Sequence, residues 1–400
     1  MGVGVADIGA ALMAAAETQA LKSQLNKLGC GINLAAGNER LWQYVGLDGG
    51  DVRIKAPMQT WSEVFEPIPK PGFQSLGALY RLRNEVLITA ETKLFMQALP
   101  TLESLIEQAR EILHPKPANQ PIRDDLSRLS GRYINTDSGT LYVEESGNAN
   151  GDVICMLHTA GADGRQWHGL MTHDELQPWR MLAFDMPNHG RSPVTNDKFQ
   201  WQWELDESTY VKTVCDFIKS VTDKPVILMG CSMGAAIGLA LLAQHPDLFK
   251  AAILFETPYS SPGRRTPYLN HPQVHGGRLA ATWVASLLSP NSPAPRRNLA
   301  RWIYSQSGPG VYDGDLRFYS DEFHASRHTP HIDTSKTPIW LLTGDYDYSA
   351  SPADTRRVAN EIPGAHFIEM HGFGHFPMTE DPQRLVDDYL RSILKMLGAL

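Results

Sequence analysis

Residues 230–234 constrain the fold of this 400-residue chain more than any other stretch. They read Gly-Cys-Ser-Met-Gly and follow an apolar run, 225–229, that predicts a short buried strand. Residues 235–245 then favour a helix that ends before Pro246. A serine in a G-x-S-x-G turn between strand and helix is held with its hydroxyl clear of the sheet, and the helix start directs N–H groups at a nearby anion. Ser232 is therefore a candidate nucleophile; the alternative is a tight turn that merely contains a serine.

The composition is that of an ordinary globular protein. Hydrophobic residues make up 42% and charged residues 20% of the chain, and its length allows two or three domains. The formal net charge of −8 gives no electrostatic reason to expect binding to nucleic acid or to an anionic membrane. Four cysteines form no disulfide framework at this length, the start lacks a basic signal region, and no apolar run could span a membrane. We therefore expect a cytoplasmic protein with a small-molecule substrate.

Residues 1–113 predict a small α+β domain of their own. A helix is expected over about 7–28, then a β-meander, a further strand and a closing helix over 99–113. A proline-rich segment follows, and we expect 114–128 to be a linker. The strands of this domain are expected at 31–36, 41–47, 51–56 and 85–89.

Residues 129–400 predict a mostly parallel sheet with helices on both faces. Two antiparallel strands open this region, and short continuous apolar runs typical of central parallel strands then alternate with helices. An alternation of this kind indicates an α/β fold. The strands are expected at 131–135, 141–145, 153–157, 181–184, 225–229, 251–255, 339–343 and 366–370.

A serine nucleophile needs a base, and the base needs a group that orients it. In an open α/β sheet such groups lie at the carboxyl ends of strands. Asp347 and Asp345 both follow the strand expected at 339–343. We favour Asp347, because a loop beyond the strand end can turn its carboxylate toward an imidazole. His375 follows the strand expected at 366–370 and is the predicted base.

Two groups of histidines have spacings that resemble metal sites. His371 and His375 give an H-x₃-H spacing, but no helix is expected around them. The other group lies in a polar, loop-rich segment and is expected to be solvated surface. We therefore expect no metal and no cofactor. The second group consists of His324, His328 and His331 beside Asp321 and Glu322.

An oxyanion that forms on a carbonyl substrate needs two N–H donors. One is expected from Met233, directly after the candidate nucleophile. The other is expected from the loop after the strand at 153–157. Ala160 is our choice in that loop, with Thr159 second.

These motifs together resemble the serine α/β-hydrolases over about residues 130–400. The order Ser232, Asp347, His375 is the order of that family. Two residues, Thr159 and Asn188, stand where the family usually has glycine. The motifs that carry the resemblance are His158-Thr159-Ala160-Gly161, the run Asp185-Met186-Pro187-Asn188-His189-Gly190-Arg191-Ser192, the turn at 230–234, the stretch 344–347 and Gly374-His375.

The resemblance implies an α/β-hydrolase fold with a cap insertion at about 258–337. Aromatic residues in the cap favour a bulky, largely apolar substrate, and the alternative is that they form the cap's own core. These aromatics are Trp283, Trp302, Tyr304, Tyr312, Phe318, Tyr319 and Phe323. The residues expected to contact substrate are His158, Thr159, Trp167 and Cys231.

The expected function is a serine hydrolase that cleaves a carboxylic ester, lactone or thioester through an acyl-enzyme. The alternatives are a hydrolase of carbon–carbon bonds in β-diketones or ring-fission products, an acyltransferase and a catalytically silent ligand-binding protein. Residues 5–113 also resemble, distantly, the sterol-carrier-protein-2 fold, which implies an apolar ligand or an interaction role. A structural appendage is the favoured reading of this domain, and a homodimer formed through it is a hypothesis.

Overall fold

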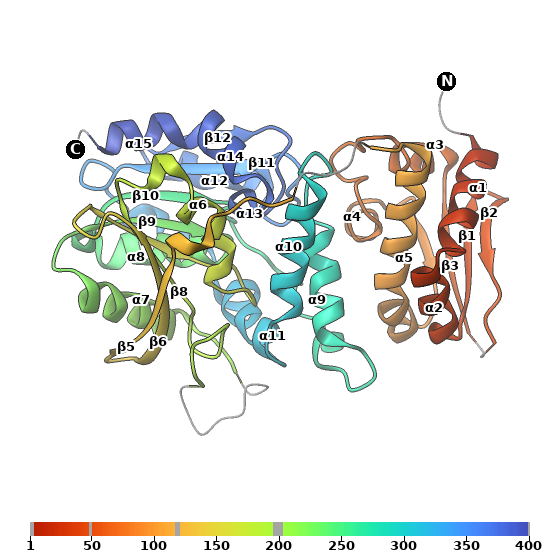
Figure 1. Cartoon of the computed structure of the whole chain (residues 1–400), viewed down its shortest axis with the longest axis horizontal. Helices are drawn as coiled ribbons and strands as arrows, with labels where there is room; N and C mark the ends of the chain where they lie inside the picture. Colours follow the sequence, from red (N-terminus) through yellow and green to blue (C-terminus); the bar gives the residue numbers. More distant parts are fainter. Residues whose placement is uncertain (1–3, 48–49, 117–120, 195–202, 399–400) are drawn as a thin grey trace.

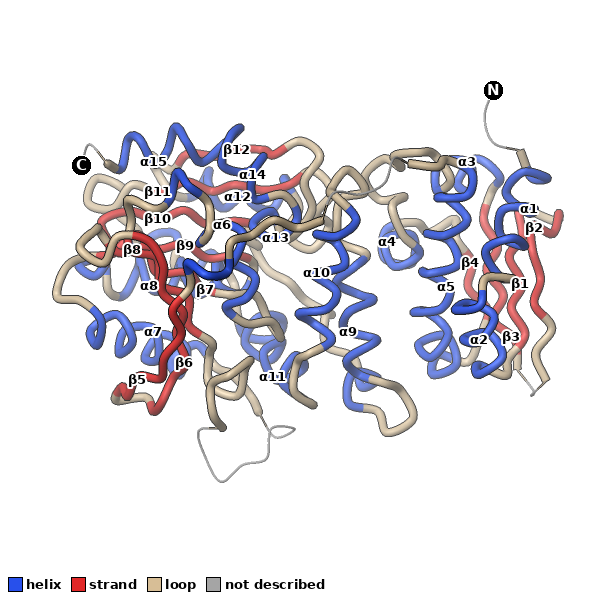
Figure 2. Tube along the Cα trace, viewed as in Figure 1, coloured by secondary structure: helices blue, strands red, loops and turns tan. Residues whose placement is uncertain are grey.

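The computed structural model describes residues 4–47, 50–116, 121–194 and 203–398. It contains a four-stranded sheet near the N-terminus and an eight-stranded sheet in the rest of the chain (Figure 2). Helices α9 and α10 lie between the two sheets (Figure 1). Residues 117–120 of the expected linker lie outside the described residues. None of the described helices is both long and apolar enough to cross a membrane.

The N-terminal region is a four-stranded sheet packed against helices. The long helix α5 begins at Thr92, before the expected start at Leu99, and continues through Pro100. Two short helices, α3 and α4, were not expected from the sequence. The elements are α1 (Val5–Ala16), α2 (Gln19–Leu28), β1 (Gly31–Ala36), β2 (Glu39–Tyr44), β3 (Asp51–Ala56), α3 (Met58–Val64), α4 (Leu76–Leu82), β4 (Leu87–Thr89) and α5 (Thr92–Leu113).

Two predictions for this region are wrong. The single helix over 7–28 is two helices, because Thr18 adopts an extended conformation and its hydroxyl donates to Ala15 O at the end of α1. The strands form no meander: the sheet order is β2-β1-β3-β4, with β1 antiparallel to β2 and parallel to β3. Alternation of apolar residues predicts the strands but not their order, and the apolar β1 takes a central place with Ile32 and Leu34 buried.

The larger sheet has the order β12-β11-β10-β9-β7-β8-β6-β5. The pairs β5–β6 and β6–β8 are antiparallel and the others parallel, so that the predicted antiparallel opening pair and mostly parallel sheet are both present. The chain reverses its direction of travel across the sheet between β7 and β9, and ligands bind at such switch points, beyond the carboxyl ends of the strands. The strands are β5 (Ser130–Thr136), β6 (Gly139–Gly147), β7 (Val153–Leu157), β8 (Arg180–Phe184), β9 (Val226–Cys231), β10 (Phe249–Phe255), β11 (Ile339–Gly344) and β12 (His366–Met370).

Helices cover both faces of this sheet, and side chains alternate between two buried clusters. In β7, Cys155 and Leu157 join the cluster that contains residues of α7, α8 and α12, whereas Ile154 and Met156 join the cluster of α6, α14 and α15. The two-residue period of a strand thus fills both faces. The helices are α6 (His168–Met171), α7 (Glu207–Val221), α8 (Met233–Gln244), α12 (Pro352–Glu361), α13 (Pro377–Glu380), α14 (Pro382–Leu385) and α15 (Arg391–Leu397).

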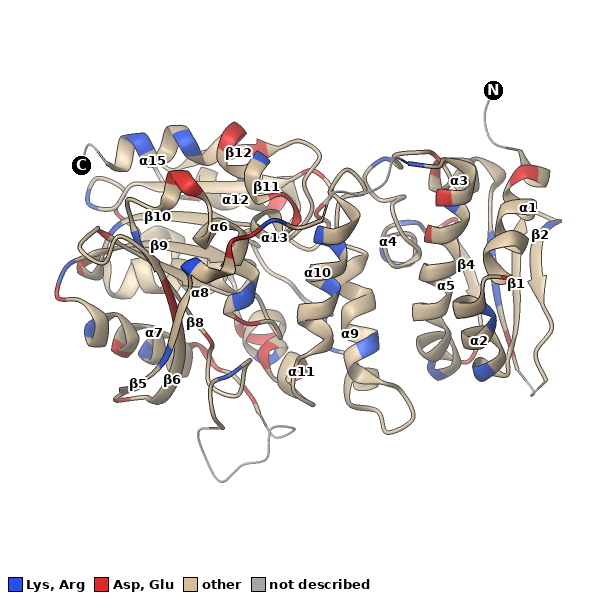
Figure 3. Ribbon diagram, in the orientation of Figure 1, with Lys and Arg blue, Asp and Glu red and all other residues tan. Residues whose placement is uncertain are grey.

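The segment between β10 and β11 forms the cap. It contains α9 (Gly276–Ala285), α10 (Ala294–Ser305), α11 (Val311–Leu316) and a π-helical turn, η7 (Arg317–Glu322). Basic residues of α10 face acidic residues of α5 (Figure 3), and Glu107 of α5 pairs with Arg297 at 3.2 Å and Arg301 at 2.9 Å. The cap therefore contacts the N-terminal region.

We predict that Glu103 makes stability pH-dependent at this contact. Burial raises the pKa of Glu103 from 4.5 to about 7, although Gly77 and Leu76 N–H groups donate to its carboxylate. The folded chain then holds a proton that the unfolded chain releases. The stability due to this group is present below about pH 4.5 and is lost as the pH rises through about 7.

Thermal unfolding of wild type and Glu103→Gln at pH 5 and pH 8 tests this prediction. The melting temperature of Glu103→Gln minus that of wild type should be larger at pH 8 than at pH 5, because only wild type loses stability as Glu103 ionises. Glu111→Gln, at an exposed carboxylate of the same helix, serves as the control and should show no such change. An equal pH dependence in wild type and Glu103→Gln would contradict the prediction.

Candidate active site

Ser232 occupies a strained turn between β9 and α8. Its φ is +55°, a conformation that costs a non-glycine residue about 1–3 kcal/mol. A Cβ on Gly230 would lie 2.3 Å from Gly234 O, and a Cβ on Gly234 would lie 2.4 Å from Leu157 O. Both glycines are therefore required by close backbone contacts, as the G-x-S-x-G pattern predicted. Ser232 N–H donates to Phe255 O at 3.0 Å, which ties the turn to the neighbouring strand.

The structure brings Ser232, His375 and Asp347 into one hydrogen-bonded chain. His375 Nε2 lies 2.8 Å from Ser232 Oγ, and His375 Nδ1 lies 2.6 Å from Asp347 Oδ2. All three residues are buried, each with 3% of its surface exposed. The Asp347 carboxylate also accepts N–H groups of Ser349, at 2.6 Å, and Ala350, at 3.2 Å. This is the geometry in which a carboxylate orients an imidazole toward a hydroxyl.

The pKa values of two buried carboxyl groups at the site are shifted in opposite directions. Burial alone raises the pKa of Asp347, but the His375 imidazole and hydrogen bonds bring it below its ordinary range. Burial, and then the adjacent Asp347 charge, raise the pKa of Glu256 well above its ordinary range. Glu256 follows β10, and its carboxyl group accepts Gly344 N–H at 2.9 Å and contacts the Thr343 hydroxyl at 2.6 Å. Asp347 is thus the charged partner of the imidazole and Glu256 a neutral neighbour.

The potential ligand atoms of Glu256, Asp347 and His375 lie within 4.8 Å of one another. This spacing alone would also suit a metal ion. However, His375 uses one ring nitrogen toward Asp347 and the other toward Ser232. A neutral carboxyl and an imidazole engaged at both nitrogens are poor metal ligands, because binding needs their free lone pairs.

The competing residues considered from the sequence lie elsewhere. Asp345 accepts the N–H of Gly372, in the loop after β12, at 2.8 Å rather than making a local turn contact, and His371 is exposed beside it. His328 is buried and lies 3.1 Å from Glu207. His324 contacts Ser326 at 2.7 Å. Among the described residues, none of these histidines belongs to a group with metal-ligand spacing.

Hydrogen bonds in the loop after β7 decide which N–H groups can face an oxyanion. Thr159 N–H donates to Gln166 Oε1 at 3.1 Å, and Gly161 N–H donates to Asp315 Oδ2 at 2.7 Å. Within the part of the chain that the structure describes, no acceptor contacts the N–H groups of Ala160 and Met233. Thr159, the second choice from the sequence, is therefore occupied. Ala160 and Met233 keep the free donors.

The four residues predicted to contact substrate are all buried, and their role toward substrate stays a prediction. His158 Nε2 accepts Met186 N–H at 3.1 Å while its Nδ1 lies 2.9 Å from Thr159 O, and burial lowers the pKa of its imidazole. The Thr159 hydroxyl contacts Gln166 and Tyr304. Cys231 Sγ donates to His375 O at 3.3 Å. Trp167 is fully buried against Phe255 and lies in the core. The polar side-chain atoms of His158, Thr159 and Cys231 are thus paired within the protein, whereas Trp167 Nε1 has no hydrogen-bond partner among the described residues.

A buried network that the sequence did not predict joins the cap to this loop. Asp315 of α11 lies 2.7 Å from His189 Nε2 and accepts both Gly161 N–H and, at 2.8 Å, Trp203 Nε1–H. Burial alone lowers the pKa of His189, but Asp315 raises it above its ordinary value. In the sequence, Asp315 could have been identified as an acidic residue placed among the aromatic residues of the cap. For Glu256, the signal was its place directly after a predicted strand.

Tyr319 of η7 contacts the candidate nucleophile from the cap. Its Oη lies 3.1 Å from Ser232 Oγ, and burial raises the pKa of its phenol. Tyr304 and Phe318 are also buried, whereas Trp302 is half-exposed. Most of the aromatic residues noted in the cap therefore pack in its interior. Tyr319 is the one that reaches Ser232 among the described residues.

Residues 156–388 match the sequence model of the alpha/beta hydrolase family, and the chain belongs to that family. A lipase of Mycobacterium tuberculosis is 29% identical over 179 residues, which are 44% of this chain and 60% of the lipase. An esterase of the same organism is 23% identical over 251 residues, 58% of this chain and 80% of the esterase. Across four curated relatives, including the lipase, the chain spans between 35% and 60% of the relative's own length.

Solved structures show the same fold. The enol-lactonase from Burkholderia xenovorans matches with a TM-score of 0.57 and 20% identity, over 67% of this chain and 100% of the lactonase. A thermophilic esterase from Thermogutta terrifontis matches with a TM-score of 0.55 and 18% identity, over 67% of this chain and 98% of the esterase. The predicted α/β-hydrolase fold is thereby confirmed. The likeness of the N-terminal region to the sterol-carrier-protein-2 fold stays a prediction.

We predict that Asp347 and Glu256 respond differently to loss of charge. Asp347→Asn removes the carboxylate that orients His375, and kcat should fall by about 10⁴-fold, the loss that this change causes in a serine triad. Glu256→Gln replaces one neutral hydrogen-bonding group with another, and kcat should stay within about threefold of wild type. Steady-state kinetics with an aryl ester measures both. A larger loss in Glu256→Gln than in Asp347→Asn would reverse the assignment.

Proposed function

We propose that this protein is a serine hydrolase that cleaves ester-type substrates through an acyl-enzyme. The observation that carries the proposal is the buried hydrogen-bonded chain from Ser232 through His375 to Asp347. In this order the three residues have the roles of nucleophile, base and orienting acid. The lipase, esterase and enol-lactonase named above act on esters or lactones by their names, which supports the same substrate class here.

The first half of the reaction acylates Ser232. As Oγ attacks the carbonyl carbon, its proton moves to His375 Nε2, and the negative charge of Asp347 stabilises the resulting imidazolium. The carbonyl oxygen becomes an oxyanion that Ala160 and Met233 N–H groups bind. When the tetrahedral intermediate collapses, His375 gives the proton to the leaving alkoxide, and the acyl group stays on Oγ.

The second half releases the acid. A water molecule takes the place of the alcohol, His375 accepts one of its protons, and the hydroxide attacks the acyl carbon. The second oxyanion uses the same two N–H donors. Its collapse breaks the bond to Ser232 Oγ, and Oγ takes the proton back from His375. The products are a carboxylic acid and an alcohol.

Entry of substrate requires motion of the cap. Ser232 is 3% exposed, and Tyr319 lies against its hydroxyl at 3.1 Å. In this structure Ser232 Oγ–H donates to Tyr319 Oη at 3.1 Å. When Ser232 instead gives its one hydrogen to His375, the Tyr319 O–H is left as a donor beside Oγ. After the cap admits a substrate, this O–H is placed near the reacting oxygens. A donor there stabilises charge that builds up in the transition state.

The proposal predicts a single reactive serine. Wild type exposed to a fluorophosphonate should gain one adduct by intact-mass spectrometry, and Ser232→Ala should gain none, because only Ser232 is activated by His375. Wild type should also hydrolyse aryl esters or lactones, and Ser232→Ala should not. A folded wild type without any adduct would contradict the proposal and favour a silent ligand-binding protein.

The same enzyme is then offered β-diketones and, separately, an ester together with an added alcohol. Hydrolysis of the esters well above the diketones is expected. Faster cleavage of the diketones would move the assignment to carbon–carbon hydrolysis. Capture of the acyl group by the alcohol in preference to water would move it to acyl transfer. Cytoplasmic location and a homodimer through the N-terminal region stay predictions.

Tyr319→Phe tests the contact between cap and nucleophile. We expect kcat to fall by about tenfold, less than the 10²–10³-fold loss of a dedicated oxyanion donor, because the backbone donors remain. Tyr312→Phe, at a neighbouring cap tyrosine without a hydrogen bond to Ser232, is the control and should stay close to wild type. Equal kinetics of Tyr319→Phe and wild type would show that the phenol only closes the site.

A further inference from the structure

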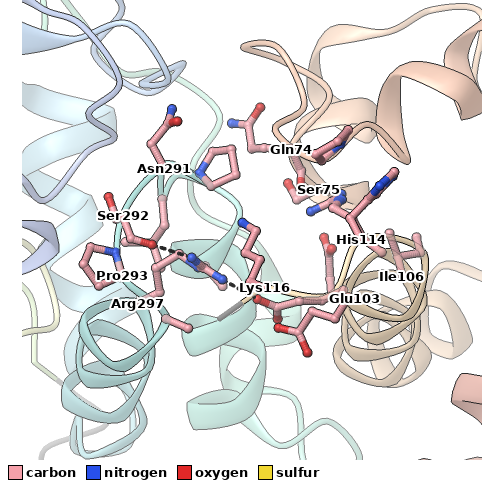
Figure 4. A pocket seen from close by; sticks show the side chains of 18 of the residues that line it. Gln74, Ser75, Glu103, Ile106, His114, Lys116, Asn291, Ser292, Pro293 and Arg297 are labelled. Carbon is pink, nitrogen blue, oxygen red and sulfur yellow. Dashed lines mark hydrogen bonds and ion pairs between the residues drawn. The ribbon is translucent and has the colours of Figure 1, made fainter. Parts of the chain in front are cut away.

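A buried glutamine of the N-terminal region, Gln74, contacts two loops of the rest of the protein. Gln74 precedes α4 and is 7% exposed. Its side-chain NH₂ donates to Ser286 O at 3.1 Å and to Tyr346 O at 3.3 Å, and its Oε1 accepts Gly72 N–H at 2.7 Å. Figure 4 shows Gln74 and Ser75 on the N-terminal side of a pocket of about 490 Å³, opposite Asn291 of the cap.

Both acceptors of the Gln74 amide lie next to the proposed triad. Tyr346 directly precedes Asp347 in the loop after β11. Ser286 directly precedes Leu287, whose carbonyl accepts the backbone N–H of His375 at 3.1 Å. The Gln74 side chain therefore connects the loop that carries Asp347 with the segment whose Leu287 carbonyl holds the backbone of His375.

Other contacts fix the same two segments. Tyr346 Oη donates to Pro69 O at 2.8 Å, and Tyr346 N–H donates to Phe373 O at 3.0 Å in the loop that leads to His375. On the cap side, Ser75 Oγ donates to Ser286 O at 3.4 Å. A Cβ on Gly77 would lie 2.7 Å from Ser286 Cβ, so α4 packs directly on this segment. The Gln74 amide therefore lies in a tightly packed contact that the residues before and in α4 make with Ser286 and Tyr346.

The packing around Gln74 is part of a wider contact between the N-terminal region and the cap. A single buried apolar cluster runs from Ile8 through Leu79 of α4 to Leu279 of α9. Arg81 of α4 lies over the Trp283 ring at 5.2 Å, and Gln97 of α5 donates to Gln273 O at 2.7 Å. The N-terminal region is thus packed against the cap.

We propose that Gln74 is a positioning residue of the hydrolase site. The inference rests on the triad assigned under the proposed function. By donating to both Ser286 O and Tyr346 O, Gln74 fixes the position of the Asp347 loop relative to the cap segment beside His375. The N-terminal region then acts as part of the scaffold of the active site. Loss of the two donors leaves the Tyr346 carbonyl unpaired and the Ser286 carbonyl with only the 3.4 Å bond from Ser75 Oγ, and the loops relax apart to reach other donors.

The expected consequence is a change in turnover with little change in binding. Misplacement of catalytic groups by about 1 Å costs up to about 10²-fold in rate, even when the substituted residue never touches substrate. In Gln74→Glu the side chain keeps the acceptor for Gly72 N–H but carries at most one hydrogen, so that at least one of the two carbonyls loses its donor. We expect kcat to fall about tenfold and KM to stay within about twofold.

The matched control is Gln97→Glu. It makes the same chemical change, in the same region, at a side chain that also donates to a cap carbonyl. Its acceptor, Gln273 O, adjoins no residue of the triad. A general weakening of the contact between the N-terminal region and the cap would affect both variants. A positioning role would affect Gln74→Glu alone.

The experiment measures kcat, KM, the pH profile of kcat and the rate of fluorophosphonate labelling for wild type and both variants, all full-length. In Gln74→Glu the acidic limb of the profile should move to lower pH, because a displaced Asp347 stabilises the imidazolium less. Labelling should slow in parallel with kcat. Unchanged kcat and pH profile in a folded Gln74→Glu, or equal losses in the two variants, would overturn the proposal.

Two further measurements keep the result interpretable. If Gln74→Glu does not fold, Gln74→Met, which removes both donors without adding a charge, takes its place and should lower kcat by about tenfold at unchanged KM; no change would overturn the proposal. If wild type itself is neither labelled nor active, the proposed function has failed. A labelled, active wild type with an unaffected Gln74→Glu instead refutes the positioning role alone.

Discussion

The hydrogen bond between His375 Nδ1 and Asp347 Oδ2 is the contact on which the arrangement of the site depends. At 2.6 Å it joins two loops that follow neighbouring parallel strands, β11 and β12. Parallel strands bring their carboxyl ends to the same edge of the sheet, so that residues far apart in sequence meet there. The charge of Asp347 is tolerated inside the protein because the imidazole and two N–H groups surround it.

The cap packs over that edge of the sheet and contributes two residues, Asp315 and Tyr319, to the surroundings of the site. Asp315 holds Gly161 N–H and His189, and Tyr319 lies against Ser232. Asp315 of the cap accepts the N–H of Gly161. In the described part of this loop, Ala160 has an N–H that no acceptor contacts. The cap therefore affects which N–H groups of this loop can face the proposed site as well as covering Ser232. Its contact with α4 and α5 extends this dependence to the N-terminal region.

Local patterns made the core of the site predictable from the sequence, and contacts between distant segments did not. Ser232 lies in a short motif with a fixed backbone requirement, and Asp347 and His375 each follow an apolar strand. The order of β1 to β4 was mispredicted because apolar alternation is compatible with several pairings. Gln74 could not be recognised at all: a glutamine before a short helix carries no pattern, and its partners are more than 200 residues away.

Backbone strain is concentrated around the same edge of the sheet. In the described part of the chain, the non-glycine residues with positive φ are Asn188 at +67°, Ser232 at +55° and Glu256 at +51°, and they follow β8, β9 and β10. Each such conformation costs about 1–3 kcal/mol, and asparagine tolerates it best, which explains why Asn188 can replace a customary glycine. Ser232 and Glu256 are held by N–H bonds to Phe255 O and Leu342 O. Hydrogen bonds to the adjacent strand thus offset the strain that presents these side chains at the site.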